Sequence, residues 1–61
     1  MREDYNGYGL STAWDDEALG FGFSVHDKNG AEVFRSVDPY FYEENALMAA
    51  RAAADVLPAQ E

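Results

Sequence analysis

Residues 19–30 read LGFGFSVHDKNG, and this stretch decides the fold. Over its first eight residues, large apolar side chains alternate with small or polar ones, which is the period-two pattern of a strand with one buried face. Asn29 and Gly30 then stand between two apolar runs, and glycine can adopt the positive φ that a tight hairpin turn requires. The stretch therefore predicts a strand that leads into a hairpin.

The neighbouring segments extend this hairpin into a meander. Upstream, the larger side chains alternate over residues 8–14, and the segment Asp15-Asp16-Glu17-Ala18 forms an acidic turn back into the central strand. Downstream, residues 31–37 form the return strand, which ends at Pro39 because proline has no N–H to give to a sheet. We expect three antiparallel strands with residues 19–26 in the middle.

A helix is expected from about Tyr42 to Leu57, where alanine and other good helix formers are concentrated. Glu43 and Glu44 suit its positive N-terminal end, and Pro58 closes it. A stripe of mostly small residues recurs at helical spacing, which lets the helix approach a sheet closely. Its members are Leu47, Ala50, Ala53, Ala54 and Leu57.

These elements predict an α+β fold: a three-stranded antiparallel meander with one C-terminal helix packed on one face, in the order β-β-β-α. The helix is expected to cover the sheet face that carries Leu10, Trp14, Phe21 and Phe23. Residues 8–57 form the single domain expected of a chain of 61 residues. Residues 1–7 are expected to be a flexible N-terminal arm, and residues 58–61 a C-terminal tail.

The facing of strand 31–37 is left open by the sequence. A three-residue loop over 28–30 turns Val33 and Val37 toward the helix and Phe34 away from it, whereas a two-residue loop does the opposite. The Asn-Gly pair favours the three-residue loop, because a type I turn followed by glycine in the left-handed region is common. The third strand is then an exposed edge that could pair with a second copy.

The uncovered face of the sheet is predicted to be smooth. If Trp14 pairs with Leu19, Ser11 lies opposite Gly22 and Ala13 opposite Gly20. Glycine inside a strand is less stable than alanine by about 0.5–1 kcal/mol, so either Phe34 covers these glycines or another surface approaches them closely. The predicted interaction surface combines this face with the loop before the helix: Gly9, Ser11, Gly20, Gly22, Ser24, Tyr40, Phe41 and Tyr42.

Composition limits the classes of partner. Four Lys and Arg stand against twelve Asp and Glu, giving a net charge of -8, while 48% of the residues are hydrophobic, which favours a folded chain. The charge disfavours nucleic acid and anionic membranes as partners. Cysteine is absent and no apolar run is long enough for a signal or a membrane span, so we expect a cytoplasmic protein.

The helix opens with Glu43-Glu44-Asn45-Ala46, and Ala49-Ala50 follows one turn later. With the preceding strands, this pattern over residues 21–57 resembles the C-terminal part of a double-stranded-RNA-binding domain. That family has a hairpin, a third strand and an alanine-rich helix, with Lys-Lys-x-Ala where this chain has glutamates. The resemblance implies a shared order of elements, but RNA binding through those lysines is not carried over.

No pattern in the sequence predicts catalysis, a metal site or a cofactor. His26 is the sole histidine and adjoins a turn, where a solvated histidine is the usual state. The run Asp15-Asp16-Glu17 lacks the distributed ligands of a calcium loop, and Asp27-x-Asn29-Gly30 has its glycine too early for one. We expect no enzyme activity and no small-molecule substrate.

By elimination, the chain is predicted to be a small acidic protein-interaction or accessory module. Its partner would be another protein or a second copy in a homodimer. The alternative is an inhibitor that mimics nucleic acid and occupies a basic groove on a partner. This alternative rests on five acidic residues: Asp15, Asp16, Glu17, Glu43 and Glu44.

Overall fold

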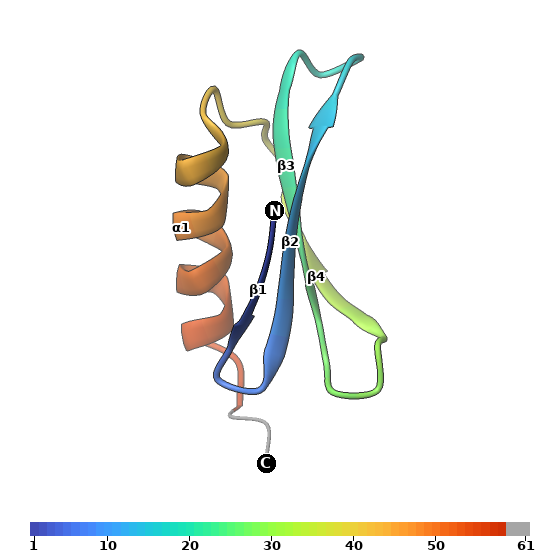
Figure 1. Ribbon diagram of the computed structural model, residues 1–61, viewed down its shortest axis with the longest axis vertical. Helices are drawn as coiled ribbons and strands as arrows, with labels where there is room; N and C mark the ends of the chain where they lie inside the picture. The colour runs from blue at the N-terminus through green and yellow to red at the C-terminus, as the bar shows by residue number, and fades with distance from the viewer. Residues whose placement is uncertain (59–61) are drawn as a thin grey trace.

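The computed structural model describes residues 1–58 and contains, in these residues, a four-stranded antiparallel sheet covered on one face by a helix (Figure 1). The strands are neighbours in chain order, β1-β2-β3-β4, and α1 follows them. Their bounds are β1 Arg2–Tyr5, β2 Tyr8–Asp15, β3 Gly20–His26, β4 Glu32–Arg35 and α1 Glu43–Asp55. The α+β class with one C-terminal helix on the sheet is confirmed.

The three-stranded meander is wrong, because residues within the expected arm 1–7 form the additional strand β1. Asn6 and Gly7 both have positive φ, 54° and 82°, which is the requirement of a two-residue type I′ hairpin turn. This turn places Tyr5 opposite Tyr8 and pairs β1 with β2 along its whole length. The Arg51 guanidinium donates two hydrogen bonds of 2.6 Å to the Glu3 carboxylate and ties β1 to the helix.

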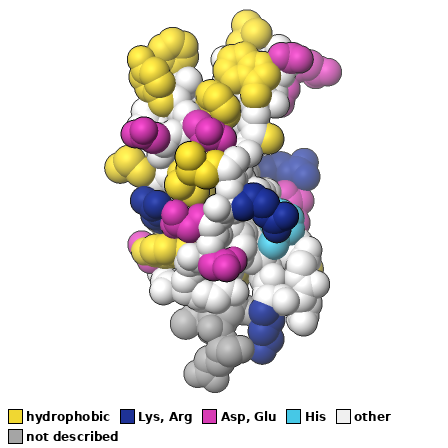
Figure 2. Space-filling view, in the orientation of Figure 1, with side chains coloured by type: hydrophobic (Ala, Val, Ile, Leu, Met, Phe, Trp, Pro, Cys, Tyr) yellow, Lys and Arg dark blue, Asp and Glu magenta, His cyan; other side chains and the backbone are white. Residues whose placement is uncertain are grey.

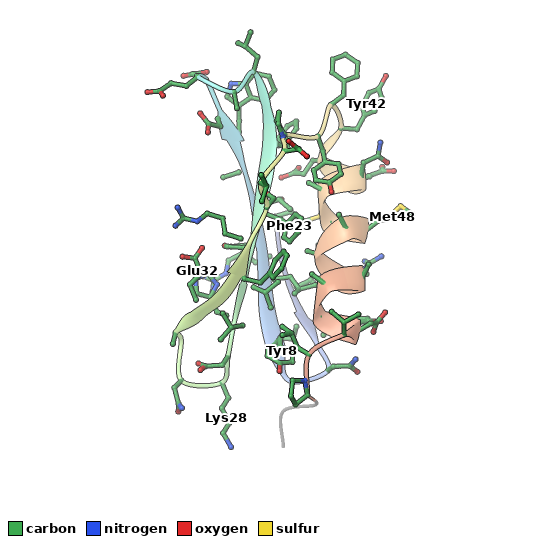
Figure 3. The ribbon with its side chains drawn as sticks, turned by 180° about the vertical axis from the view of Figure 1, so that it is seen from behind. Tyr8, Phe23, Lys28, Glu32, Tyr42 and Met48 are labelled. Carbon is green, nitrogen blue, oxygen red and sulfur yellow. The ribbon has the colours of Figure 1, made fainter. Side chains whose placement is uncertain are left out.

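The core lies between the helix and the β2–β3 hairpin. The predicted helix stripe is confirmed, with three of its members buried and Ala53 and Leu57 partly buried, although α1 ends at Asp55. Figure 3 shows Phe23 pointing from the sheet toward the helix. The buried apolar residues are Tyr8, Leu10, Phe23, Val25, Ala46, Leu47, Ala50 and Ala54.

Trp14 does not belong to this core, contrary to the sequence prediction. Its side chain is 50% exposed, and Phe21 beside it is half-buried. The reason is length: thirteen helical residues span about 20 Å, whereas the eight residues of β2 span about 26 Å. The β2–β3 hairpin therefore extends past the N-terminal end of α1 (Figure 1).

The register of β2 against β3 differs from the expected one by two residues. Trp14 lies opposite Phe21, and Ser11 lies opposite Ser24. The connecting turn keeps four residues but moves along the chain by one, from residues 15–18 to residues 16–19. A two-residue shift in register does not change the side of the sheet that each residue faces. The same small residues therefore still lie on the uncovered face.

The three-residue loop after β3 is confirmed, but the facing inferred from it is wrong. The Asp27 N–H donates to the Ala31 carbonyl at 2.9 Å, and Gly30 has a φ of 87°. A register shift next to Val25 then leaves Val33 without an opposite residue and pairs Phe34 with Val25. Phe34 therefore faces the helix side, and its ring stacks on the Phe23 ring with centroids 5.8 Å apart, although 42% of Phe34 stays exposed. Val33 and Val37 are exposed as well.

Of the expected tail, 58–61, only Pro58 is described. Its carbonyl accepts a hydrogen bond from the Tyr8 hydroxyl, which fixes the end of the helix against the start of β2. The other tail residues lie outside the described part of the chain.

Candidate functional site

Large apolar side chains are exposed at the end of the molecule where the β2–β3 turn and the start of α1 meet. We call this set the aromatic end and define it as Trp14, Leu19, Phe41 and Tyr42. Figure 2 shows hydrophobic side chains gathered there in two groups, one over the β2–β3 turn and one over the start of α1, with a notch between them. The exposed fractions are 50% for Trp14, 73% for Leu19, 76% for Phe41 and 62% for Tyr42.

The second group is held in place by backbone pairing with β3. The Phe21 N–H donates to the Tyr40 carbonyl at 2.7 Å, and the Tyr40 N–H donates to the Phe21 carbonyl at 2.8 Å. This approach requires glycine at position 20: a Cβ there would lie 2.7 Å from the Cβ of Pro39 and 2.9 Å from the Tyr40 oxygen. The chain's own loop is therefore the surface that approaches Gly20.

The side chains of the predicted loop, Tyr40 to Tyr42, divide between core and surface. The Tyr40 ring is half-buried and lies 6.1 Å from the Phe23 ring, so it completes the core. Phe41 and Tyr42 point outward and contact each other edge to face at 4.8 Å. Tyr42 projects past the start of the helix in Figure 3.

The first group is held by the acidic turn between β2 and β3. The Trp14 ring contacts Phe21 edge to face at 5.2 Å, and its indole N–H donates to the Asp16 carboxylate. The Asp15 carboxylate accepts the N–H of Glu17 at 2.9 Å and fixes the turn. Leu19 closes the turn with a φ of 55°, a conformation that few residues other than glycine, asparagine and aspartate adopt easily.

Glu43 connects the start of the helix to the sheet. Its carboxylate accepts a 2.8 Å hydrogen bond from the Thr12 hydroxyl and lies 3.2 Å from the Met1 amine. The hydrogen bond from Thr12 lowers the pKa of Glu43, and the nearby amine adds to this effect. The first turn of α1 is thereby fixed beside the β2–β3 hairpin.

The other predicted surface residues, Gly9, Ser11, Gly22 and Ser24, lie on the sheet face away from the helix, which we call the open face. All four are half-buried, and the two serine hydroxyls share a 2.8 Å hydrogen bond. A Cβ on Gly22 would lie 3.3 Å from the Ser36 hydroxyl. Phe34 lies on the opposite face and does not cover these glycines. Ser11, Gly22 and Ser24 line a shallow hollow of about 420 Å³ on the open face, which Trp14, Glu32 and Arg35 also border.

His26 borders a second hollow of about 670 Å³ at the opposite end of the sheet. The residues that line it include Asp4 and Asp27 but no Ser, Thr or Cys. The Asp27 carboxylate accepts the N–H groups of Asn29 and Ala31, both at 2.9 Å, and so belongs to the turn. Among residues 1–58, no group of three or more His, Cys, Asp or Glu could hold a metal ion.

Trp14 and Leu19 were missed as surface residues by the sequence interpretation. The available signal was the length difference between the long hairpin and the short helix, together with the three acids that follow Trp14 and oppose its burial. Nothing in the sequence marks Leu19 as exposed, because it continues the alternation of β3.

Comparison with protein-family models, with curated proteins and with solved structures found no match. In the described residues, no helix has the length and apolar character that crossing a bilayer requires.

Proposed function

We propose that the chain is a non-catalytic protein-interaction module that docks through its aromatic end. The observation that carries this proposal is that the fold leaves four large apolar side chains exposed together at one end. Aromatic residues are enriched at protein-protein contacts, because they bury a large area with little loss of conformational freedom. Clustered exposure of this kind is typical of a binding surface.

Leu19 adds a second support. A left-handed conformation is unfavourable for a leucine by about 1–2 kcal/mol, and a side chain that is 73% exposed returns little of that through burial. Glycine or asparagine would suit folding better at this position. A leucine there is explained if a partner contacts its side chain.

The other surfaces support docking less well. Gly20 is already covered by the chain's own loop. The hollow of the open face is lined mainly by small, polar and charged groups, and its large exposed apolar side chain is Trp14, which belongs to the aromatic end. The mimicry alternative is weakened because Asp15, Asp16 and Glu43 accept hydrogen bonds within the chain. Their charges have structural uses.

We include the absence of catalysis in the proposal because the hollow beside His26 offers no hydroxyl or thiol nucleophile among Ser, Thr and Cys. The proposal also includes a cytoplasmic location, supported by the lack of cysteine in the sequence.

The test is affinity capture from a lysate of the native host with three forms of the protein. One is the natural chain, the second carries Leu19→Asn with Phe41→Ser, and the third carries Met48→Gln with Val56→Thr. Met48 and Val56 are matched controls, because they are 62% and 82% exposed but lie on and after α1, with Met48 on its outer side (Figure 3).

We expect proteins that bind the natural chain and the control but not the aromatic-end variant. Because Leu19→Asn relieves an unfavourable backbone conformation, unfolding would not explain a lost partner. Equal capture by all three forms would refute docking through this end.

A further inference from the structure

The charge around the aromatic end identifies the chemistry of its partner. Six of the twelve acidic residues lie in the two segments that build this end or border them. They are Asp15, Asp16, Glu17, Asp38, Glu43 and Glu44. The same segments, residues 12–20 and 37–47, contain no lysine or arginine.

The lysine and arginine side chains belong to other segments, although Arg35 lines the hollow of the open face together with Trp14, Asp15 and Asp16. Arg51 pairs with Glu3 beside the helix, and Arg35 pairs with Glu32 on β4. Arg2 lies on β1, and Lys28 lies in the turn at the opposite end of the sheet. The charged side chains of the two segments that carry the aromatic end are therefore all acidic, and the Met1 amine, 3.2 Å from the Glu43 carboxylate, neutralises only one of them.

Carboxylates also lie directly beside the exposed rings. The Asp16 carboxylate accepts the hydrogen bond of the Trp14 indole, which fixes a negative charge at the edge of a half-exposed ring. Tyr42 lines a surface hollow together with Glu44 and with Glu43, whose carboxylate is paired with the Met1 amine. A guanidinium group can stack on an aromatic face and pair with a neighbouring carboxylate, and lysine does this less well.

We propose that the aromatic end binds an arginine-bearing segment of another protein, with apolar side chains of that segment covering the rings. This inference rests on the proposed function and specifies its partner. A second copy is a poor occupant, because each chain carries a net charge of -8 and an end-to-end dimer would bring the same acids together. An acidic segment would be repelled by these carboxylates, and a neutral segment would gain no attraction from them.

Trp14 is the chain's single tryptophan and lies within the site, so its fluorescence reports binding directly. The probes are three short amidated peptides of equal length: one of leucine and arginine, one in which glutamate replaces arginine, and one in which serine replaces leucine. We expect the leucine-arginine peptide to shift the Trp14 emission and to bind at least about tenfold more tightly than either of the others. Its affinity should fall as salt rises from about 0.05 to about 0.5 M.

Variants that each remove one charge test whether the acidic residues around the aromatic end contribute to binding. Glu17→Gln removes a charge at the aromatic end, and Asp4→Asn is its control, since Asp4 pairs with Gly9 near the opposite end of the sheet. We expect Glu17→Gln to weaken the leucine-arginine peptide severalfold and Asp4→Asn to leave it unchanged. Leu19→Asn with Phe41→Ser should weaken it at least about tenfold.

The outcomes separate this inference from the proposed function. Equal binding of the arginine and glutamate peptides, still abolished by Leu19→Asn with Phe41→Ser, would overturn the cationic partner and leave docking intact. Binding of the serine-arginine peptide as tight as that of the leucine-arginine peptide, insensitive to those substitutions, would overturn both and favour acidic mimicry.

Absence of binding by all three peptides would overturn the cationic partner, and the capture experiment would then decide docking alone. Sedimentation that shows a dimer of the natural chain, lost with the aromatic-end variant, would identify a second copy as the occupant and overturn the inference.

Discussion

Gly20→Ala tests how the aromatic end is held in place. The new Cβ would lie 2.7 Å from the Cβ of Pro39 and 2.9 Å from the Tyr40 oxygen. Neither neighbour can move away easily, because the Pro39 ring is rigid and two hydrogen bonds fix the Tyr40 backbone to β3. Overpacking of this kind costs about 1–3 kcal/mol. Alanine itself is more stable than glycine in a strand by about 0.5–1 kcal/mol, which offsets part of the cost.

Gly9→Ala is the matched control, because it adds the same methyl group in the same sheet. Its Cβ would lie 4.0 Å from the nearest side-chain atom, at His26, and so meets no clash. The difference in unfolding free energy between the two variants isolates the clash, at about 1–3 kcal/mol. In a domain of this size, each kcal/mol of unfolding free energy changes the melting temperature by roughly 4–8 °C.

The assay is urea unfolding, followed by circular dichroism and by Trp14 fluorescence. We expect Gly9→Ala to be slightly more stable than the natural chain and Gly20→Ala to be clearly less stable than Gly9→Ala. Since Gly20 positions the loop that carries Phe41 and Tyr42, Gly20→Ala should also weaken partner binding. Equal stability of the two variants would mean that residues 39–40 do not press on β3, and this account of Gly20 would be rejected.

Three further predictions concern strain, the first turn and pH. Leu19→Asn should raise the unfolding free energy by about 1 kcal/mol, measured in urea, and a loss would show that Leu19 stabilises the fold. Gly7→Ala, at a φ of 82°, should cost about 1–2 kcal/mol and speed amide hydrogen exchange in β1, whereas unchanged exchange would contradict the type I′ turn. Hydrogen bonds from Arg51 and Thr12 lower the folded-state pKa of Glu3 and Glu43, so their contribution is present above the unfolded-state pKa and is lost as pH falls through the folded-state pKa. Urea midpoints should therefore decrease below about pH 4.5, less steeply in Glu43→Gln, and an equal decrease in both would exclude Glu43 as a cause.

The elements that local patterns determine were predictable from the sequence. The alternation around Phe23, the turn at Asn29-Gly30 and the small-residue stripe of the helix each specify their structure within a few residues, and all three are present. The Asn6-Gly7 pair carried the same hairpin signal as Asn29-Gly30, but β1 lies in a polar segment with little alternation. Its stability comes from contacts distant in sequence, such as the pair of Arg51 with Glu3.

The errors arose where one residue changes the facing of all that follow. The register shift beside Val25 leaves Val33 unpaired and turns Phe34 toward the helix. No glycine, proline or other turn residue in this part of the sequence predicts the shift. Half of the candidate site was predictable from the sequence. Phe41 and Tyr42 precede a helix start that is easily recognised, so the loop that carries them could be identified. Exposure of Trp14 depends instead on how far α1 reaches along the sheet, which is a property of the assembled fold.

Exposure of the aromatic end also couples binding to stability. At about 0.05–0.15 kcal/mol per residue, a domain of this size has roughly 3–9 kcal/mol of unfolding free energy. A ligand that binds only the folded chain adds about 2.7 kcal/mol at a hundredfold excess over its dissociation constant, which here corresponds to roughly 10–20 °C in melting temperature. We therefore expect the leucine-arginine peptide, at such an excess, to raise the melting temperature of the natural chain by that amount. Because Leu19→Asn with Phe41→Ser removes the contacts and leaves the core unchanged, the same peptide concentration should raise its melting temperature far less. An equal rise in both proteins would place the peptide elsewhere on the surface.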